Sequence, residues 1–223
     1  MVKFMIYVFY CDISPLSDDI FFNLAKKCIQ KDMMVKTDRL KFRKDKNLSM
    51  AGHLLLKYAL EYLKFEYENT CFKRTKSGKP FAENINIKFS ISHSGNFAAV
   101  ALSDSDIGID IEKTKDYNPA VAKRFFTENE YDMIMSFENE HEKEDMFFRM
   151  WTLKEAYVKM AGESIFNFKD FEILPFEKKY YCSNTIDGCK FKEFDINGYK
   201  MSVSFMTEDA KTEINRISLS DYI

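Results

Sequence analysis

The chain has 223 residues, of which 46% are hydrophobic and 30% are charged, and its formal net charge is -2. This is an ordinary globular composition, with enough apolar residues for a sizeable core in one large domain or two small ones. It excludes a disordered segment and a protein that coats nucleic acid, because both need a strong charge excess.

The charge is unevenly distributed along the chain. Residues 1–103 contain 17 Lys and Arg against 10 Asp and Glu, whereas residues 104–223 contain 16 against 25. A basic half suits a phosphate-rich ligand and an acidic half suits a metal ion, although two solvated surfaces of opposite sign are the simpler explanation. The charge counts alone do not choose between these two explanations.

The five cysteines are scattered, with no CxxC pair and no spacing typical of a zinc site. Their number and spacing favour a reducing cytoplasm over an oxidising compartment. No run of about 20 apolar residues occurs, so we expect no membrane span. The short apolar run at the start breaks at Asp12 and predicts a first β-strand more than a secretion signal.

Hydrophobic periodicity places the elements of the two halves in a similar order. In the first half we expect a strand at the start, helices over about 17–29 and 48–63, a turn at 77–80, and strands over 87–92 and 97–102. After a polar break at Asp104 we expect a strand over 107–112, helices between about 119 and 161, and strands near 171–174 and 199–206. No residue-level repeat is visible.

The predicted strand over 107–112 is IGIDIE, which alternates strictly. Its isoleucines therefore point to one face, and Asp110 and Glu112 point together to the other. Two adjacent carboxylates beside Gly108 suggest a cation or a ligand between them. A strand whose outer face is simply solvated is an equally good explanation of the hexapeptide alone.

A predicted helix near residue 155 brings a third carboxylate and a lysine. Trp151, Glu155 and Lys159 recur at i, i+4 and i+8, beside a stripe formed by Met150, Leu153, Tyr157 and Met160. The simpler interpretation is a surface ion pair next to a core tryptophan. The functional interpretation is that three carboxylates provide the oxygen ligands that Mg²⁺ prefers.

Two further segments offer groups that suit a phosphate. Hydroxyls and an imidazole cluster in SISHSG over 90–95, at the end of a predicted strand, and Lys79 follows Gly78 in a predicted turn. By itself, a single histidine is usually structural and a turn lysine is usually a solvated charge.

Five segments in a fixed order resemble the surfactin-synthetase-activating type of 4'-phosphopantetheinyl transferase: GKP at 78–80, SISHSG at 90–95, IGIDIEKT at 107–114, KRFFTENEY at 123–131, and WTLKEAYVKMAG at 151–162. Their order and spacing are those of the family. The resemblance is weaker over 36–52 and does not extend to the first strand or the C-terminal third.

The resemblance implies a role for each matching residue. Asp110, Glu112 and Glu155 would bind Mg²⁺, and Glu155 is the favoured base for the acceptor serine, with Glu112 or a water as alternatives. Lys159 would contact the pyrophosphate of coenzyme A. The residues that would bind the nucleotide end are Lys36, Ser49, Lys79, Ser92 and His93, with His93 at the 3'-phosphate. Glu130 matches a characteristic acid of the family.

The implied activity is transfer of the 4'-phosphopantetheine group from coenzyme A to a serine of an acyl or peptidyl carrier protein, with release of 3',5'-ADP. The alternatives are a Mg²⁺-dependent phosphohydrolase and a carrier-binding module without catalysis. The implied fold is α+β, with two similar subdomains, 1–104 and 105–223, related by a pseudo-twofold axis around a ligand cleft. A monomer is sufficient for such a site, and no nucleic acid or membrane partner is expected.

The sequence departs from the family pattern in its front region. Met33 and Leu48 stand where the family often has a basic residue, and Lys44, one helical turn before Leu48, is a candidate replacement. Val121, Phe125 and Phe126 are candidates for docking a carrier helix, although at least one Phe is expected in the core.

Overall fold

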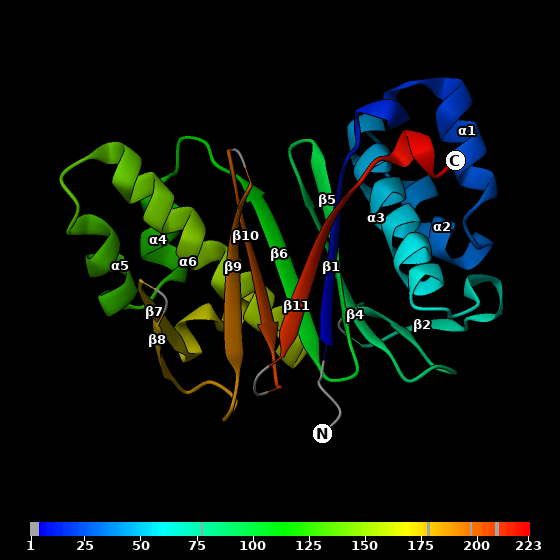
Figure 1. The fold of residues 1–223 in the computed structure, drawn as a ribbon. Coiled ribbons are helices and arrows are strands. Elements are labelled where there is room, and N and C mark those ends of the chain that lie inside the picture. The colour runs from blue at the N-terminus through cyan, green and yellow to red at the C-terminus, as the bar shows by residue number, and fades with distance from the viewer. Residues whose placement is uncertain (1–4, 77, 178, 197, 208–209) are drawn as a thin grey trace. The chain divides into compact units, whose positions relative to one another are not determined.

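The protein is described by a computed structural model that covers residues 5–76, 78–177, 179–196, 198–207 and 210–223. It divides into two compact units, Met1–Ser105 with Asp209–Ile223, and Asp106–Glu208. Each unit combines β-sheet with helices, so the predicted α+β class is confirmed (Figure 1). The pseudo-twofold axis and the cleft concern the relative placement of the units and stay predictions.

The first unit is built around a four-stranded sheet with the strand order β11-β1-β5-β4. Its strands are β1 (Met5–Asp12), β4 (Lys88–Ser94), β5 (Phe97–Ser103), β11 (Lys211–Ile217) and the separate hairpin of β2 (Phe72–Arg74) and β3 (Pro80–Ala82). Its helices are α1 (Asp19–Lys27), α2 (Lys31–Arg39), α3 (Arg43–Tyr62) and the short 3₁₀ turns Ser14–Ser17, Tyr67–Asn69 and Leu219–Asp221.

Helix α3 forms the centre of the first unit's core. It begins five residues earlier than predicted, and its buried residues pack with those of β1, β4 and β5 in one cluster. Met33 and Leu48 belong to this cluster, with 2% and 8% of their surface exposed. These two positions are therefore apolar because they fill the core, and not because a phosphate contact has been lost.

The end of the chain departs from the predicted domain division. Residues 209–223 were expected in the C-terminal subdomain, but they return to the first unit. There β11 pairs in parallel with β1, from Met5 opposite Lys211 to Cys11 opposite Ile217, as the blue and red strands of Figure 1 show. Leu219 is buried in the core of the same unit, which anchors the last turn.

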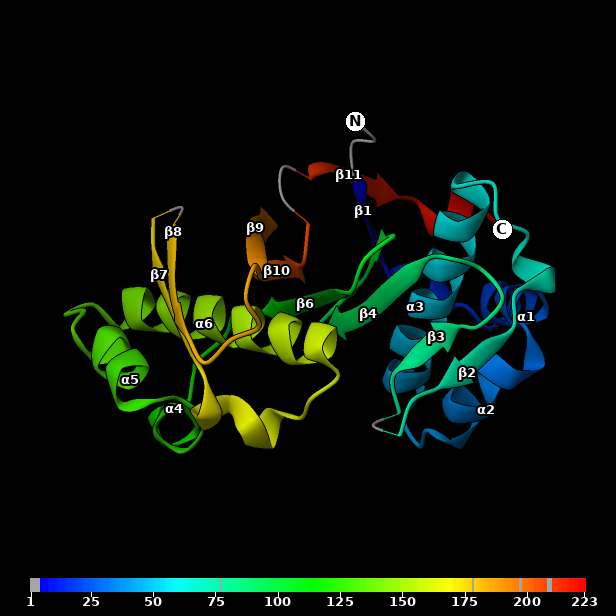
Figure 2. The same cartoon turned by 90° about the horizontal axis from the view of Figure 1, so that it is seen from below.

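The second unit has a three-stranded sheet with the order β6-β10-β9 and a separate β7–β8 hairpin. Its strands are β6 (Ile107–Lys113), β7 (Glu172–Phe176), β8 (Lys179–Ser183), β9 (Lys190–Ile196) and β10 (Tyr199–Phe205). Its helices are α4 (Pro119–Phe125), α5 (Glu128–Met135), α6 (Glu140–Ala161) and the 3₁₀ segment Ile165–Asp170. The long helix α6 runs along this sheet (Figure 2).

Gly108 allows α6 to approach β6 unusually closely. A Cβ atom at this position would lie 1.9 Å from the carbonyl oxygen of Ala156 and 2.7 Å from the backbone nitrogen of Met160. The hydroxyl of Ser204 on β10 donates a hydrogen bond of 2.8 Å to the same Ala156 carbonyl. The bare backbone at Gly108 therefore serves helix packing, and a ligand between Asp110 and Glu112 stays a prediction.

A buried ion pair joins three elements of the second unit. Lys154 on α6 and Glu130 on α5 are both fully buried, and the lysine Nζ lies 2.7 and 2.8 Å from the two carboxylate oxygens. Lys154 also donates to the carbonyl of Phe171, and Glu130 accepts from the backbone nitrogens of Thr127 and Ile173. Glu130, the characteristic acid of the motif, thus connects α5, α6 and β7.

Candidate functional site

The acidic residues of β6 lie on the face that α6 covers. Gly108 contacts α6, and the alternation of the strand places Asp110 and Glu112 on the same face. Asp110 is 2% exposed, whereas Glu112 is half-buried. A merely solvated outer face is therefore excluded for Asp110, since an ionised carboxylate is buried only with compensating partners.

Lys159 of α6 forms an ion pair with Asp110. Its Nζ lies 2.6 Å from Asp110 Oδ1 and 3.9 Å from Glu155 Oε2. The second distance is the predicted i, i+4 contact along the helix. Trp151, Glu155 and Lys159 form the predicted stripe, and all three are half-buried. The four residues Asp110, Glu112, Glu155 and Lys159 thus belong to one cluster on β6 and α6, which we call the acidic cluster.

The pKa values of Glu155 and Lys159 are shifted by their neighbours in the acidic cluster. Burial, with the charges of Asp110 and Glu112, raises the pKa of Glu155 to about 7, although Lys159 acts in the opposite direction. For Lys159, burial lowers the pKa, but the surrounding carboxylates outweigh it and the net direction is upward. Lys159 therefore stays charged at neutral pH, while Glu155 exists in both protonation states.

The donor set of the acidic cluster fits a hard divalent cation better than a soft one. All three acids offer carboxylate oxygens, and neither sulfur nor imidazole contributes, which suits Mg²⁺ over Zn²⁺. As arranged in the structure, however, no three acidic, histidine or cysteine side chains converge on a common metal position among the described residues. The metal site thus stays a prediction.

The predicted nucleotide residues all lie in the first unit, on different elements. Lys36 is exposed on α2, and Ser49 on α3 shares a hydrogen bond with the buried hydroxyl of Thr37. Ser92 is buried on β4, and the exposed His93 beside it points to the opposite face of that strand. These four residues therefore do not form one continuous cradle as they stand.

Lys79 lies in the loop that joins β2 and β3. Its backbone nitrogen donates to the hydroxyl of Thr75, and its carbonyl accepts from the Thr75 nitrogen. Gly78 has a φ of +87°, which a glycine adopts without strain. The turn predicted at 77–80 is thus present at Gly78 and Lys79, whereas Ser77 lies outside the described residues.

A buried histidine that the motifs did not indicate connects several of these groups. His53 on α3 is 7% exposed. Burial, together with the electrostatic effects of Arg74, His93 and Lys36, lowers its pKa to about 4. These three side chains, from β2, β4 and α2, are thus close enough to His53 to act on it electrostatically, and we call the four residues the cationic cluster.

Arg74 is the second residue that sequence reasoning missed. It is exposed at the end of β2, and its Nη1 donates a hydrogen bond of 3.1 Å to the carbonyl of Gly78. Its position four residues before the GKP motif was the available signal, but a lone arginine next to a turn is usually a solvated charge. Only the fold brings it near Lys36 and His93.

Comparisons with known proteins agree over most of the chain. A family model described as "4'-phosphopantetheinyl transferase superfamily" matches residues 106–204, and one described as "4'-phosphopantetheinyl transferase, N-terminal" matches residues 14–105. Among solved structures, a holo-[acyl-carrier-protein] synthase from Thermotoga maritima covers 46% of this chain and 62% of its own, with 16% identity and a TM-score of 0.36.

Two bacterial relatives are similar over long segments. The 4'-phosphopantetheinyl transferase gsp of Aneurinibacillus migulanus is 32% identical over 163 residues, which cover 73% of this chain and 68% of the relative. The transferase ffp of Bacillus subtilis is 28% identical over 224 residues, with 96% and 97% covered. The chain belongs to the 4'-phosphopantetheinyl transferase superfamily.

Proposed function

We propose that this protein transfers the 4'-phosphopantetheine group of coenzyme A to a serine of an acyl or peptidyl carrier protein, with Mg²⁺ held by Asp110, Glu112 and Glu155. The observation that supports this most is the acidic cluster, in which three carboxylates and Lys159 meet where β6 and α6 touch. Its members lie within the segment that the superfamily model matches. No relative that we compared supports the phosphohydrolase or the non-catalytic module.

When bound, Mg²⁺ would neutralise the pyrophosphate charge that develops during transfer. Lys159 would add a second positive charge, because its ammonium already lies within the acidic cluster. In the absence of substrate, its contact with Asp110 offsets part of the repulsion among the carboxylates. We propose that it turns to the pyrophosphate when coenzyme A binds.

Glu155 is our candidate for the general base. In the transfer step the serine Oγ forms a bond to the β-phosphorus, the bond from that phosphorus to the bridging oxygen breaks, and 3',5'-ADP leaves with the bonding electrons. The serine proton passes to a carboxylate. A base with a pKa near the working pH is the most effective. In the metal-free cluster, burial and the charges of Asp110 and Glu112 raise the pKa of Glu155, which favours proton transfer to this carboxylate.

The nucleotide end is proposed to bind the first unit. Lys36, Arg74 and His93 of the cationic cluster would contact phosphate groups, with His93 at the 3'-phosphate, and Ser49, Lys79 and Ser92 would complete the site. The basic balance of residues 1–103 agrees with this assignment. Leu48 and Met33 take no part, because both are buried in the core.

The carrier docking surface involves fewer residues than the sequence suggested. Phe126 is 1% exposed, so it belongs to the core and cannot contact a partner. Val121 and Phe125 are half-buried, and Phe125 packs edge-on against Trp151, with ring centroids 5.8 Å apart. Docking by Val121 and Phe125 stays a proposal.

We place the protein in the cytoplasm as a monomer, and both assignments are proposals. All five cysteines lie in described segments and are free thiols, which fits a reducing compartment. Across the parts of the chain that the structure describes, none of the helices has the length and apolar character needed to cross a membrane.

The test is the intact mass of an apo carrier protein after incubation with this protein, coenzyme A and Mg²⁺. We expect a gain of about 340 Da on the carrier that disappears when a chelator removes the metal. Release of phosphate without a change in carrier mass would favour the phosphohydrolase. Carrier binding with neither product would favour the non-catalytic module, and either result would overturn the proposal.

A further inference from the structure

A cavity of about 600 Å³ lies in the second unit between α6, the β7–β8 hairpin and strands β9 and β10. It is on a different side of α6 from the acidic cluster. Six residues separate Arg149 from Glu155, which at about 100° per residue places the two side chains about 120° apart around the helix. Arg149 therefore faces β9, whereas Glu155 and Lys159 face β6.

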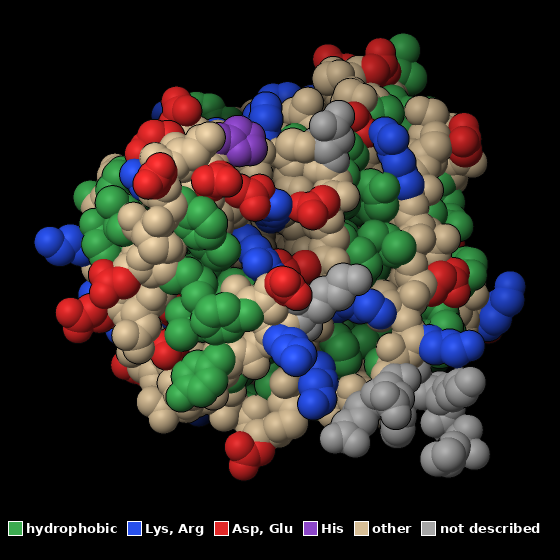
Figure 3. All heavy atoms as spheres, turned by 60° about the vertical axis from the view of Figure 1, so that its left-hand side comes forward, with side chains coloured by type: hydrophobic (Ala, Val, Ile, Leu, Met, Phe, Trp, Pro, Cys, Tyr) green, Lys and Arg blue, Asp and Glu red, His purple; other side chains and the backbone are tan. Residues whose placement is uncertain are grey.

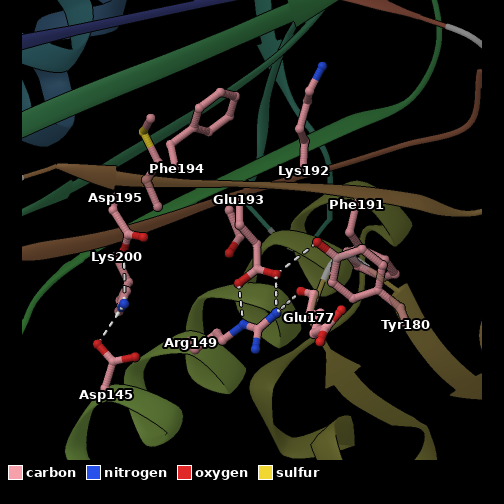
Figure 4. Close-up of a pocket in the computed structure, with 12 residues that line it drawn as sticks. Asp145, Arg149, Glu177, Tyr180, Phe191, Lys192, Glu193, Phe194, Asp195 and Lys200 are labelled. Atoms are coloured by element: carbon pink, nitrogen blue, oxygen red, sulfur yellow. Dashed lines mark hydrogen bonds and ion pairs between the residues drawn. The ribbon is translucent and has the colours of Figure 1, made fainter. Parts of the chain in front are cut away.

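One arginine spans this cavity. Its Nε lies 2.7 Å from Glu193 Oε2 on β9, and its Nη2 lies 2.9 Å from Glu193 Oε1 (Figure 4). The Nη2 of Arg149 also donates, at 2.6 Å, to the carbonyl of Glu177 in the β7–β8 turn. The guanidinium thus holds α6 to two separate elements, in a planar two-point contact that a lysine cannot reproduce.

Glu193 is itself held in place. The hydroxyl of Tyr180 on β8 donates a hydrogen bond of 2.8 Å to Glu193 Oε1. Burial and the charge of Glu193 raise the pKa of Tyr180, so the tyrosine stays a donor at neutral pH. The side chains of Arg149 and Glu193 are only 17% and 23% exposed, which limits screening of their charges by water.

A second ionic contact crosses the same cavity in a looser way. Lys200 on β10 lies 2.6 Å from Asp145 of α6 and 2.8 Å from Asp195 of β9. Both acids are substantially exposed, at 43% and 81%, and an ammonium makes point contacts without a fixed orientation. Acidic and basic side chains are also interspersed around a hollow in the space-filling view (Figure 3).

We propose that Arg149 is a positioning residue for the transfer reaction, and this proposal rests on the site residues proposed above. Its two-point contact with Glu193 adds a directional constraint on the rotation of α6, and so on the place of Glu155 and Lys159. Buried side chains pack the opposite flank of α6, whereas on the flank that faces β9 the contact across the cavity is made by polar side chains. On the other flank, Gly108 sets the distance between α6 and β6, and the Ser204 hydroxyl on β10 donates to the Ala156 carbonyl of the helix.

Small rotations of α6 would have large consequences. A rotation of about 10° moves a carboxylate that lies about 6 Å from the helix axis by about 1 Å. A misplacement of about 1 Å in a catalytic group costs up to about 100-fold in rate. Substrate binding depends on more groups than these two, so the loss should fall on kcat and leave KM nearly unchanged.

The test compares Arg149→Met and Arg149→Lys with the wild-type protein in the carrier-transfer assay. We expect kcat to fall at least 10-fold in Arg149→Met and about 5-fold in Arg149→Lys, with KM for coenzyme A and for the carrier within about 2-fold. The matched control is Asp145→Asn, which removes an ionic contact across the same cavity and should change kcat less than 2-fold. Circular dichroism confirms that each variant is folded.

A second pair of variants covers the case in which Arg149→Met does not fold. Tyr180→Phe and Glu193→Gln leave the arginine in place, and we expect kcat to fall about 2-fold in the first and about 5-fold in the second. The double variant Arg149→Lys with Glu193→Gln should be no slower than the slower of its two single variants, because both changes break the same contact. Folded variants with wild-type kcat would overturn the inference while leaving the transferase intact. An inactive wild-type protein would instead refute the proposed function.

Discussion

The two clusters of proposed functional residues are built in different ways. In the cationic cluster, Lys36, Arg74 and His93 are exposed and come from α2, β2 and β4. In the acidic cluster, Asp110 and Glu155 come from one strand and one helix in direct contact, and their side chains are only 3% and 17% exposed. The first is an assembly of separate surface charges, and the second is part of a packed interface.

This difference separates binding from chemistry. Exposed cationic side chains adjust to a ligand at low cost, which suits recognition of phosphates. Buried carboxylates repel one another and change their acidity, as the raised pKa of Glu155 shows, which suits proton transfer and metal binding. Substitutions in the acidic cluster should therefore affect rate, and those in the cationic cluster should affect affinity.

The largest expected effect is that of Asp110→Ala. Loss of this carboxylate removes a proposed metal ligand and the partner of Lys159, so the transfer rate should fall about 1,000-fold, measured by intact mass of the carrier over time. Asp116→Ala, an exposed acid three residues after β6, is the control and should retain the full rate. A residual rate within 10-fold of wild type would show that Asp110 is not a ligand.

Glu130→Gln should break the scaffold behind the acidic cluster. It leaves Lys154 fully buried without its ion-pair partner, and breaking such a pair costs about 3–5 kcal/mol of unfolding free energy. Urea denaturation monitored by fluorescence gives this value, with the exposed Glu128→Gln on the same helix as the control. A loss below about 1 kcal/mol would mean that the pair is not needed to hold α5, α6 and β7 together.

Gly108→Ala tests the close approach of β6 and α6. Because the new Cβ would overlap the carbonyl oxygen of Ala156, the helix must move away, at a cost of about 1–3 kcal/mol of unfolding free energy. Gly188→Ala is the comparison, since no atom lies within 4 Å of its added Cβ and only its φ of +81° opposes the change. Equal losses in the two variants, measured by denaturant unfolding, would contradict the packing role of Gly108.

The metal affinity should depend on pH through Glu155. A carboxyl with a pKa of about 7 is mostly protonated at pH 6 and mostly ionised at pH 8, and Mg²⁺ binds the ionised form. The Mg²⁺ concentration for half-maximal activity should therefore fall about 10-fold between pH 6 and pH 8. An Mg²⁺ requirement that is constant over this range would place Glu155 outside the metal site.

The smallest effect is expected in the cationic cluster. Arg74→Ala removes one exposed positive charge, which should raise KM for coenzyme A about 5-fold and leave kcat unchanged. Lys76→Ala, another exposed cation of the same loop, is the matched control and should leave both constants unchanged. A fall in kcat in Arg74→Ala would contradict the claim that the cationic cluster affects only the affinity for coenzyme A.

Sequence patterns predicted the acidic cluster better than the rest of the molecule. Strict alternation placed Asp110 and Glu112 on one face of β6, and the 3.6-residue period placed Glu155 and Lys159 on one stripe of α6, because both patterns are local. The resemblance then joined the two elements. What local patterns could not show is that Gly108 faces the helix, since that depends on a contact between residues about 50 positions apart.

Long-range pairing explains most of the remaining differences. The sequence of β11 is polar and charged, so its residue types do not predict a strand. Its place is set by parallel pairing with β1, which lies at the other end of the chain. Helix α2 is only nine residues long and mostly polar, and it was not among the predicted helices. His53 lies in an apolar stretch of α3, and a histidine in such a stretch is expected to be a core residue. Arg74 and His93 come from other elements, so only the fold shows that they act on His53.

The most direct test of the account is crystallographic. Crystals of the wild-type protein with coenzyme A and Mn²⁺, as an anomalous scatterer in place of Mg²⁺, locate the metal without reference to activity. We predict one anomalous peak with carboxylate oxygens of Asp110, Glu112 and Glu155 at about 2.0–2.3 Å. A peak bound only by phosphate oxygens, or by acids outside this cluster, would contradict the assignment of the metal site.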